Sequence, residues 1–246
     1  MAEKTVNVRT QDGDMETFIV HPDADGPHPA VILYMDAPGI RDELYEFCRR
    51  ISGHGYYVLL PDLYYRLGKL RFITDKVPEV SEELRAKMFE AMNSLTNALV
   101  LGDTAGMLEF LQGESAAKAG PKGCIGYCMS GRYVTSVAGT FPEDFAAAAS
   151  LYGVGIVTDQ PDSPHLLADR IKGELYFGFA GNDPYVPDNV APDLKAALDE
   201  HGVTYRMDVW PDTEHGFCFP RRKVYNEDSA EQVWELVFDL FKRRLG

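Results

Sequence analysis

The chain has 246 residues, of which 45% are apolar and 25% are charged, and its formal net charge at pH 7 is −14. A chain of this length and composition has enough apolar residues to bury one large core, which predicts a single domain over residues 1–246. The negative charge argues against nucleic acid and anionic membranes as partners. An anionic substrate would need a local cation in its pocket.

The N-terminus and the cysteines predict a cytoplasmic protein, and the sequence gives no sign of a metal or an organic cofactor. Residues 1–5 lead into alternating residues with no signal-peptide core, and no window approaches the roughly 18 apolar residues of a membrane helix. The cysteines have neither metal-ligand spacing nor the density of a disulfide framework, and we expect reduced thiols at Cys48, Cys124, Cys128 and Cys218.

Strand and helix patterns alternate along the chain. It opens with a predicted hairpin, in which Asp12-Gly13 joins strands at 5–10 and 15–21. The further strands are expected at 30–35, 56–60, 123–127, 145–152, 174–180 and 204–210. Helices are expected at 43–53, 82–93, 103–111, from about 130, and at 191–201 and 229–244. This order predicts an α/β fold: a mostly parallel, twisted sheet of about eight strands with helices on both faces and an N-terminal antiparallel hairpin.

Ligands of such sheets bind beyond the carboxyl ends of the strands. The residues in those places include a cysteine between a strand and a helix, in Gly126-Tyr127-Cys128-Met129-Ser130-Gly131. A strand-to-helix elbow strains its central residue and points the side chain out over the sheet edge. Small residues at 126 and 130 allow the strand and helix to cross closely. The helix N-terminus also favours a thiolate at Cys128, which is therefore the candidate nucleophile.

A thiol nucleophile needs a base within reach and a group that orients the base. Asp183 follows the predicted strand 174–180, and His215 follows the last predicted strand. Their order along the chain is nucleophile, acid, histidine, which is the order of the α/β-hydrolase triad. Among the six histidines, His215 alone has both this order and a place after a strand.

With these residues placed, the whole chain resembles the dienelactone hydrolase (carboxymethylenebutenolidase) family of α/β-hydrolases. The resemblance is carried by Gly126-Tyr127-Cys128, by Pro61-Asp62-Leu63-Tyr64, by Asp183 with Val186-Pro187, and by His215-Gly216-Phe217. It implies a single-domain α/β-hydrolase fold and hydrolysis of activated carboxylic esters, such as enol lactones, through a thioester on cysteine.

The resemblance also implies roles for further residues. The backbone N–H groups of Met129 and Ala37 would form the oxyanion hole, and Asp36 takes the place of the family's glutamate that holds the resting thiol. Arg85 matches one of two arginines that grip a substrate carboxylate. The position of the second arginine holds Phe219, with Arg221 and Arg222 nearby but out of register.

Aromatic side chains are candidates for the pocket lining, and Phe89 shares a helix face with Arg85 four residues earlier. The substrate-binding candidates are Arg85, Phe89, Tyr64 and Tyr152, and Tyr65 and Tyr185 are further aromatic candidates.

Three interpretations of the function remain open from the sequence. They are a lactone hydrolase, a general carboxylesterase for small esters, and a non-hydrolytic protein that binds ligands or senses oxidants through Cys128. As partners we expect a small-molecule ester or lactone substrate, and the chain is expected to be a monomer or small homo-oligomer.

Overall fold

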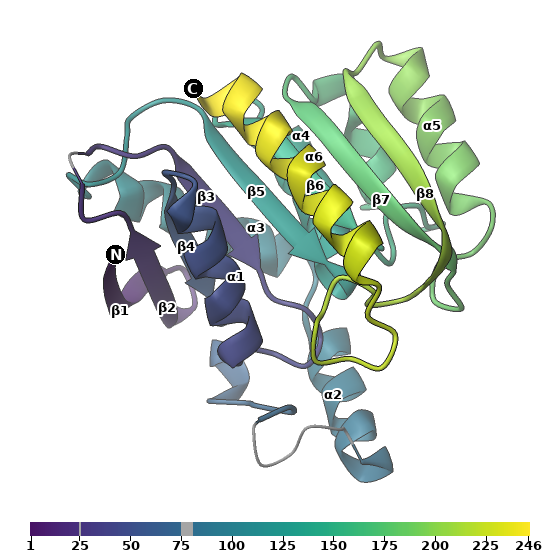
Figure 1. Ribbon diagram of the computed structural model, residues 1–246, viewed down its shortest axis with the longest axis horizontal. Coiled ribbons are helices and arrows are strands. Elements are labelled where there is room, and N and C mark those ends of the chain that lie inside the picture. Colours follow the sequence, from purple (N-terminus) through teal and green to yellow (C-terminus); the bar gives the residue numbers. More distant parts are fainter. Residues whose placement is uncertain (25, 75–80) are drawn as a thin grey trace. The chain divides into compact units, whose positions relative to one another are not determined.

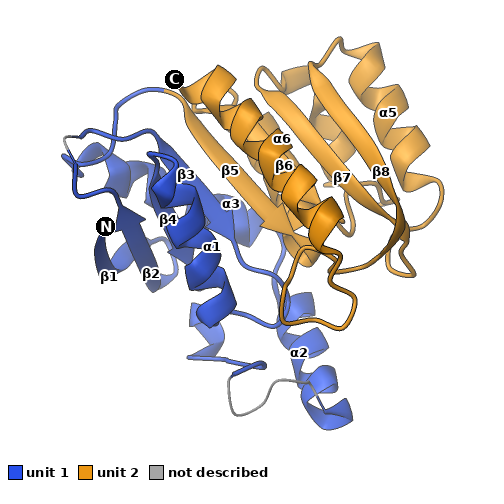
Figure 2. Ribbon diagram, viewed as in Figure 1, with its two compact units in different colours: residues 1–120 blue, residues 121–246 orange. Residues whose placement is uncertain are grey.

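The computed structural model describes residues 1–24, 26–74 and 81–246 (Figure 1). The chain divides into two compact units, Met1–Gly120 and Pro121–Gly246 (Figure 2). Each unit has four strands among its described residues. The single domain expected over residues 1–246 stays a prediction.

The first unit begins with the predicted hairpin. β1 (Ala2–Thr10) pairs antiparallel with β2 (Gly13–His21), which pairs antiparallel with β4 (Tyr57–Pro61). β3 (Ala30–Tyr34) pairs parallel with β4, so the order is β1-β2-β4-β3. Every residue of β3 and β4 is buried, in keeping with their continuous apolar runs.

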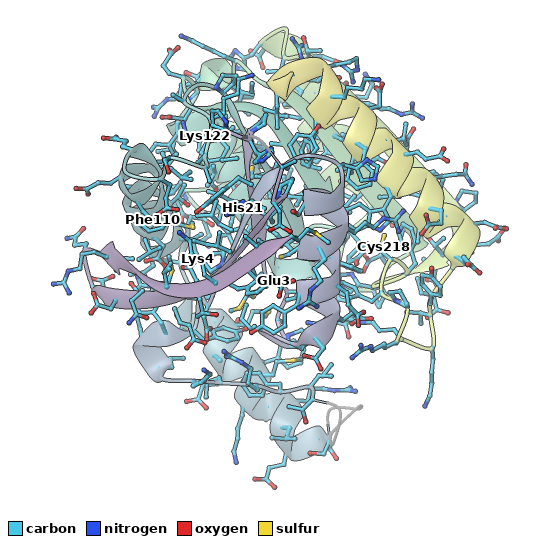
Figure 3. The ribbon with its side chains drawn as sticks, turned by 60° about the vertical axis from the view of Figure 1, so that its left-hand side comes forward. Glu3, Lys4, His21, Phe110, Lys122 and Cys218 are labelled. Atoms are coloured by element: carbon cyan, nitrogen blue, oxygen red, sulfur yellow. The ribbon has the colours of Figure 1, made fainter. Side chains whose placement is uncertain are left out.

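Helices cover both faces of this sheet. Glu3 and Lys4 are successive residues of β1 whose side chains point to opposite sides (Figure 3). Glu3 accepts hydrogen bonds of 2.7 and 2.9 Å from Arg49 of α1 (Asp42–Gly53), and Lys4 donates to Glu114, just beyond α3 (Asn97–Gln112), at 2.6 Å. The helix α2 (Glu82–Ser94) and a short 3-10 turn (Tyr65–Leu67) complete the unit.

The helix α3 starts six residues earlier than its apolar pattern indicated. The hydroxyl of Thr96 accepts from the backbone N–H of Leu99 and caps the helix at this point. Gly106 lets α3 approach β1, because a Cβ there would lie 2.6 Å from the carbonyl oxygen of Arg9.

The second unit is an all-parallel sheet in the order β5-β6-β7-β8. Its strands are β5 (Lys122–Tyr127), β6 (Phe145–Leu151), β7 (Glu174–Asn182) and β8 (Tyr205–Glu214). Its helices are α4 (Gly131–Thr140), α5 (Val190–Glu200) and α6 (Glu227–Leu245). Figure 1 shows α6 on one face of these strands and α4 on the other, as the sequence predicted.

Two segments of this unit differ from expectation. The segment containing Pro164 forms a 3-10 helix (Pro164–Arg170) instead of an irregular loop. β8 extends to Glu214, four residues beyond its predicted end. The extension passes through Asp212, whose φ of 57° and the accompanying shift in pairing with β7 interrupt the apolar alternation that marks a strand.

No helix in the described part of the chain is both long enough and apolar enough to span a membrane.

Candidate active site

Cys128 lies at a strand-to-helix elbow in the second unit. β5 ends at Tyr127, Cys128 has a φ of 57°, and a short 3-10 turn (Cys128–Ser130) leads into α4. A non-glycine residue holds this left-handed conformation only where its surroundings enforce it. A Cβ at Gly126 would lie 2.7 Å from the carbonyl oxygen of Ser130, which explains the glycine. The turn is the one that the sequence predicted.

A second close crossing holds the elbow, and no pattern in the sequence indicated it. A Cβ at Gly131 would lie 2.2 Å from the Cα of Gly153, so the start of α4 touches the loop after β6 backbone to backbone. The next residue in that loop, Val154, donates its N–H to the carbonyl oxygen of Cys128 at 2.9 Å. The loop therefore fixes the backbone of Cys128.

Asp183 and His215 emerge side by side from neighbouring strands. Asn182 of β7 and Glu214 of β8 are paired in the sheet, and the two candidate residues come next in each chain segment. Nδ1 of His215 lies 2.7 Å from Oδ2 of Asp183, and the side chains are 8% and 4% exposed. Because an ionised carboxylate only accepts hydrogen bonds, Nδ1 carries the hydrogen and Nε2 is left as the reactive nitrogen.

The other carboxylate oxygen of Asp183 is also engaged. Oδ1 accepts the backbone N–H of Tyr185 at 3.0 Å, which closes a turn around the acid. Both oxygens of Asp183 thus have donors at fixed positions, and the side chain is oriented before any ligand binds.

The imidazole of His215 also interacts with Cys128. Nε2 is buried and meets no atom of the described residues in regular hydrogen-bond geometry. The Cys128 side chain is nevertheless close enough to influence the charge on the ring. Burial lowers the pKa of His215, but interaction with Asp183 and with Cys128 outweighs burial and raises this pKa from 6.5 to about 9. The structure therefore brings together Cys128, His215 and Asp183.

Two tyrosine rings flank the imidazole. The ring of Tyr152, which is fully buried, packs edge-on at 5.0 Å between centroids, and that of Tyr185 packs at 4.8 Å on a loop. Tyr152 has a φ of 38°, and its N–H donates to the carbonyl oxygen of Gly178 at 2.6 Å. Tyr152 therefore packs on His215; the predicted contact of Tyr152 with substrate stays a prediction.

Arg222 lies against Gly216, the residue after His215. Its guanidinium stacks over the ring of Phe219 at 4.7 Å. A Cβ at Gly216, the residue after His215, would lie 2.5 Å from a terminal nitrogen of Arg222, and Gly216 has a φ of 96°. Phe219 thus occupies the position where the resemblance implies an arginine. Its ring packs against the guanidinium of Arg222, three residues later.

The loop after β3 in the first unit is braced by buried polar contacts. Asp36 is fully buried, and its oxygens accept from Arg41 at 2.5 and 3.0 Å. Arg41 also donates to Glu43 at 3.2 Å. The sequence did not single out Arg41, because an arginine in a loop gives no sign of burial. The buried hydroxyl of Tyr64 donates to the carbonyl oxygen of Ala37 at 2.8 Å, so Tyr64 orients the peptide that follows Ala37.

The remaining predicted site residues are Met129, Arg85 and Phe89. Met129 is buried in the turn after Cys128, where its N–H stands at the start of the helical segment. Arg85 is exposed and Phe89 half-buried on α2, of which only Ala91 is buried among the described residues. Their predicted contact with substrate, and the oxyanion-hole roles of Met129 and Ala37, stay predictions.

Within residues 1–24, 26–74 and 81–246, no three His, Cys, Asp or Glu side chains gather in a way that could hold a metal ion.

Comparison with known proteins gives one consistent result. The model of the dienelactone hydrolase family matches residues 15–245. A protein from Synechocystis, provisionally named a carboxymethylenebutenolidase, is 26% identical over 243 residues, covering 98% of this chain and 96% of its own. A similarly named protein from Methylorubrum extorquens is also 26% identical, over 97% of this chain and 80% of its own.

Solved structures show the same fold. A protein from Klebsiella pneumoniae, provisionally named a dienelactone hydrolase, superposes with a TM-score of 0.86 at 23% identity, covering 98% of each chain. A dienelactone hydrolase-like promiscuous phosphotriesterase from metagenomic libraries gives a TM-score of 0.81 at 18% identity, over 100% of this chain and 99% of its own. These likenesses confirm the predicted fold class.

Proposed function

Because the chain belongs to the dienelactone hydrolase family and is a hydrolase, we propose that it cleaves activated carboxylic esters, enol lactones among them, with Cys128 as the nucleophile. The observation that supports the proposal is that His215 in the second unit interacts with both Asp183 and Cys128, with Nδ1 of His215 and Asp183 joined at 2.7 Å. A binding or sensing protein needs an accessible thiol but neither a base nor an oriented acid.

The proposed reaction has two halves. The thiol of Cys128 gives its proton to His215, and the thiolate attacks the ester carbonyl carbon while the backbone N–H groups of Met129 and Ala37, the positions that the resemblance implies, stabilise the oxyanion. The tetrahedral intermediate collapses to a thioester, and the leaving oxygen takes the proton of His215. Water then gives a proton to His215 and attacks the thioester; the acid is released, and the expelled sulfur takes the proton back from His215 to restore the thiol.

The raised pKa of His215 fits the first half. With a pKa of about 9, the imidazole carries the proton that the leaving oxygen needs at neutral pH. Asp183 keeps this proton transfer on Nε2 by holding Nδ1 as a donor.

A thiol nucleophile favours esters with good leaving groups. Thiols are more acidic than alcohols, so a thiolate leaves more easily than an ordinary alkoxide and the intermediate formed from an alkyl ester returns to substrate. Enol and phenol oxygens compete with the sulfur. The Cys128→Ser variant is therefore expected to lose enol lactone turnover more than turnover of a simple alkyl ester; equal losses contradict the argument.

Arg222 is our candidate for the cation that an anionic substrate needs. It contacts Gly216 next to His215 and is held by the ring of Phe219. Arg222→Ala is expected to lower kcat/KM for an anionic enol lactone about tenfold, the scale of one charge-assisted hydrogen bond, and to leave a neutral ester unchanged. Arg221→Ala, at the exposed neighbouring residue, is the matched control.

Arg85, on the exposed helix α2, is tested with the same pair of substrates. If Arg85→Ala and Arg222→Ala both leave the anionic lactone unaffected, the carboxylate part of the proposal fails. A general carboxylesterase for small neutral esters is then the better description.

The proposal as a whole is tested with p-nitrophenyl acetate. We expect a burst of p-nitrophenol equal to the enzyme concentration and a trapped acetyl group on Cys128, both absent in Cys128→Ala. If the burst persists in Cys128→Ala, the nucleophile is wrong; if the wild type gives no turnover, the non-hydrolytic interpretation is favoured.

The remaining parts of the proposal concern the setting of the enzyme. We propose a small-molecule substrate, a single domain over residues 1–246, a cytoplasmic location and a monomer or small homo-oligomer. Gel filtration with light scattering tests the last of these.

A further inference from the structure

The leaving group of the ester departs next to the imidazole of His215, and the structure shows which residues pack on that ring. If His215 protonates the leaving oxygen, as the proposed function requires, that oxygen lies at Nε2. The atoms attached to the oxygen must then lie close to the ring of His215. The residues packed on this ring therefore border the leaving group, whatever the acyl part of the ester is.

Of the groups that the structure packs on the imidazole in the second unit, Tyr185 is the one with an open surface. Asp183 lies at Nδ1, away from the reacting nitrogen, and Tyr152 is fully buried. Tyr185 is 51% exposed, although its ring centroid is 4.8 Å from that of His215 at an interplanar angle of 66°. Tyr185 thus packs against the imidazole on one side while about half of the residue stays exposed.

The backbone of Tyr185 is fixed even though its ring is exposed. Its N–H donates to Oδ1 of Asp183 at 3.0 Å, and the next N–H, of Val186, donates to the carbonyl oxygen of Asp183 at 3.3 Å. The acid that orients His215 therefore also sets the position of Tyr185. An exposed aromatic side chain that is held in this way is more useful as a binding surface than one on a loose loop, because less conformational entropy is lost on contact.

We propose that Tyr185 forms the wall against which the leaving group of the ester packs, and that it makes the enzyme prefer flat, unsaturated leaving groups such as phenols and extended enols. Such groups offer a face or an edge to the tyrosine ring. The same groups are the good leaving groups that a thiol nucleophile requires, so both features select one substrate class.

The proposal rests on the proposed function and makes a kinetic prediction. In an acyclic ester the leaving group is present only during acylation, because the thioester that remains on Cys128 contains the acyl part alone; in a lactone the two parts stay joined, so acyclic esters are the substrates for the test. Tyr185 should therefore affect kcat/KM, which reports acylation, and leave the deacylation rate constant unchanged.

Two acetate esters separate these steps. p-Nitrophenyl acetate and vinyl acetate form the same acetyl-enzyme, but one releases an aromatic ring and the other a two-carbon enol. We expect Tyr185→Ala to lower kcat/KM for p-nitrophenyl acetate about fivefold or more and for vinyl acetate less than twofold. Tyr185→Phe keeps the ring and should match the wild type. Tyr205→Ala is the control, because it removes a tyrosine at the end of β8 that lies farthest along the strand from His215.

Three results would overturn the proposal. If Tyr185→Ala slows both esters and deacylation alike, the ring holds His215 in place and does not select the leaving group. If both esters are unaffected, the leaving group does not pack there. If Tyr185→Phe behaves like Tyr185→Ala, the hydroxyl group is what matters. Failure of the proposed function itself looks different, since turnover of both esters would then survive in Cys128→Ala or be absent from the wild type.

Discussion

Replacing Asp183 by asparagine tests the electrostatics of the site without changing its shape. Oδ1 and Oδ2 of Asp183 accept from the N–H of Tyr185 and from Nδ1 of His215. An asparagine can accept at only one of these positions, because its other terminal atom is an NH2 donor. If the amide oxygen stays on Tyr185, the NH2 group faces Nδ1. The imidazole must then place its hydrogen on Nε2, the wrong nitrogen for a base.

The size of the effect follows from the pKa of His215. Its rise from 6.5 to about 9 corresponds to about 3 kcal/mol at 1.36 kcal/mol per pKa unit. Because the pKa of His215 is raised in the folded protein, its protonation stabilises the folded state. This contribution is fully present below pH 6.5 and is lost as the pH rises through about 9. Loss of the neighbouring negative charge in Asp183→Asn should lower the pKa of His215 by about 1 to 3 units. We expect kcat/KM to fall about 100-fold or more.

The assay is an NMR titration of the histidine ring protons between pH 5 and about pH 10, the range that a pKa near 9 requires. The chain has six histidines, and the signal missing in His215→Gln identifies the one of interest. Asp188→Asn is the matched control, because it removes the same charge from an exposed side chain on the same loop. A pKa of His215 that stays near 9 in Asp183→Asn would show that Asp183 does not set the charge on the imidazole.

Three further predictions concern reactivity and stability. Iodoacetamide at neutral pH should alkylate Cys128 first, read by peptide mass spectrometry, because burial raises the pKa of the other three thiols, Cys48, Cys124 and Cys218; modification of those three at an equal rate would contradict it. Gly131→Ala should lower the free energy of unfolding in urea by about 2 kcal/mol or more, because its Cβ would lie 2.2 Å from the Cα of Gly153; unchanged stability would show that the crossing is loose. Arg41→Met should lower the free energy of unfolding by about 3 to 5 kcal/mol, because it removes the cation that donates to both oxygens of buried Asp36. Adding Asp36→Asn should recover part of this loss; a double variant no more stable than Arg41→Met would contradict the pairing.

The amino-acid pattern by itself determined the strands and helices that carry the site. Continuous apolar runs identified β3, β4 and β5, and period-3.6 patterns identified α1 and α6. The residue types after the strands then indicated Cys128, Asp183 and His215, because ligands of parallel sheets bind at the carboxyl ends of the strands. These are local or periodic features, so a single sequence contains them.

The tertiary structure alone decided how side chains meet across distant segments. Pairing of Asn182 with Glu214 brings Asp183 to His215, and this pairing follows a shift in register at Asp212 that no alternation of residues marks. The backbone contact of Gly131 with Gly153 was equally invisible, because a glycine looks the same in a loose turn and in a tight crossing. Such contacts depend on sheet register and packing distances, which chain order does not specify.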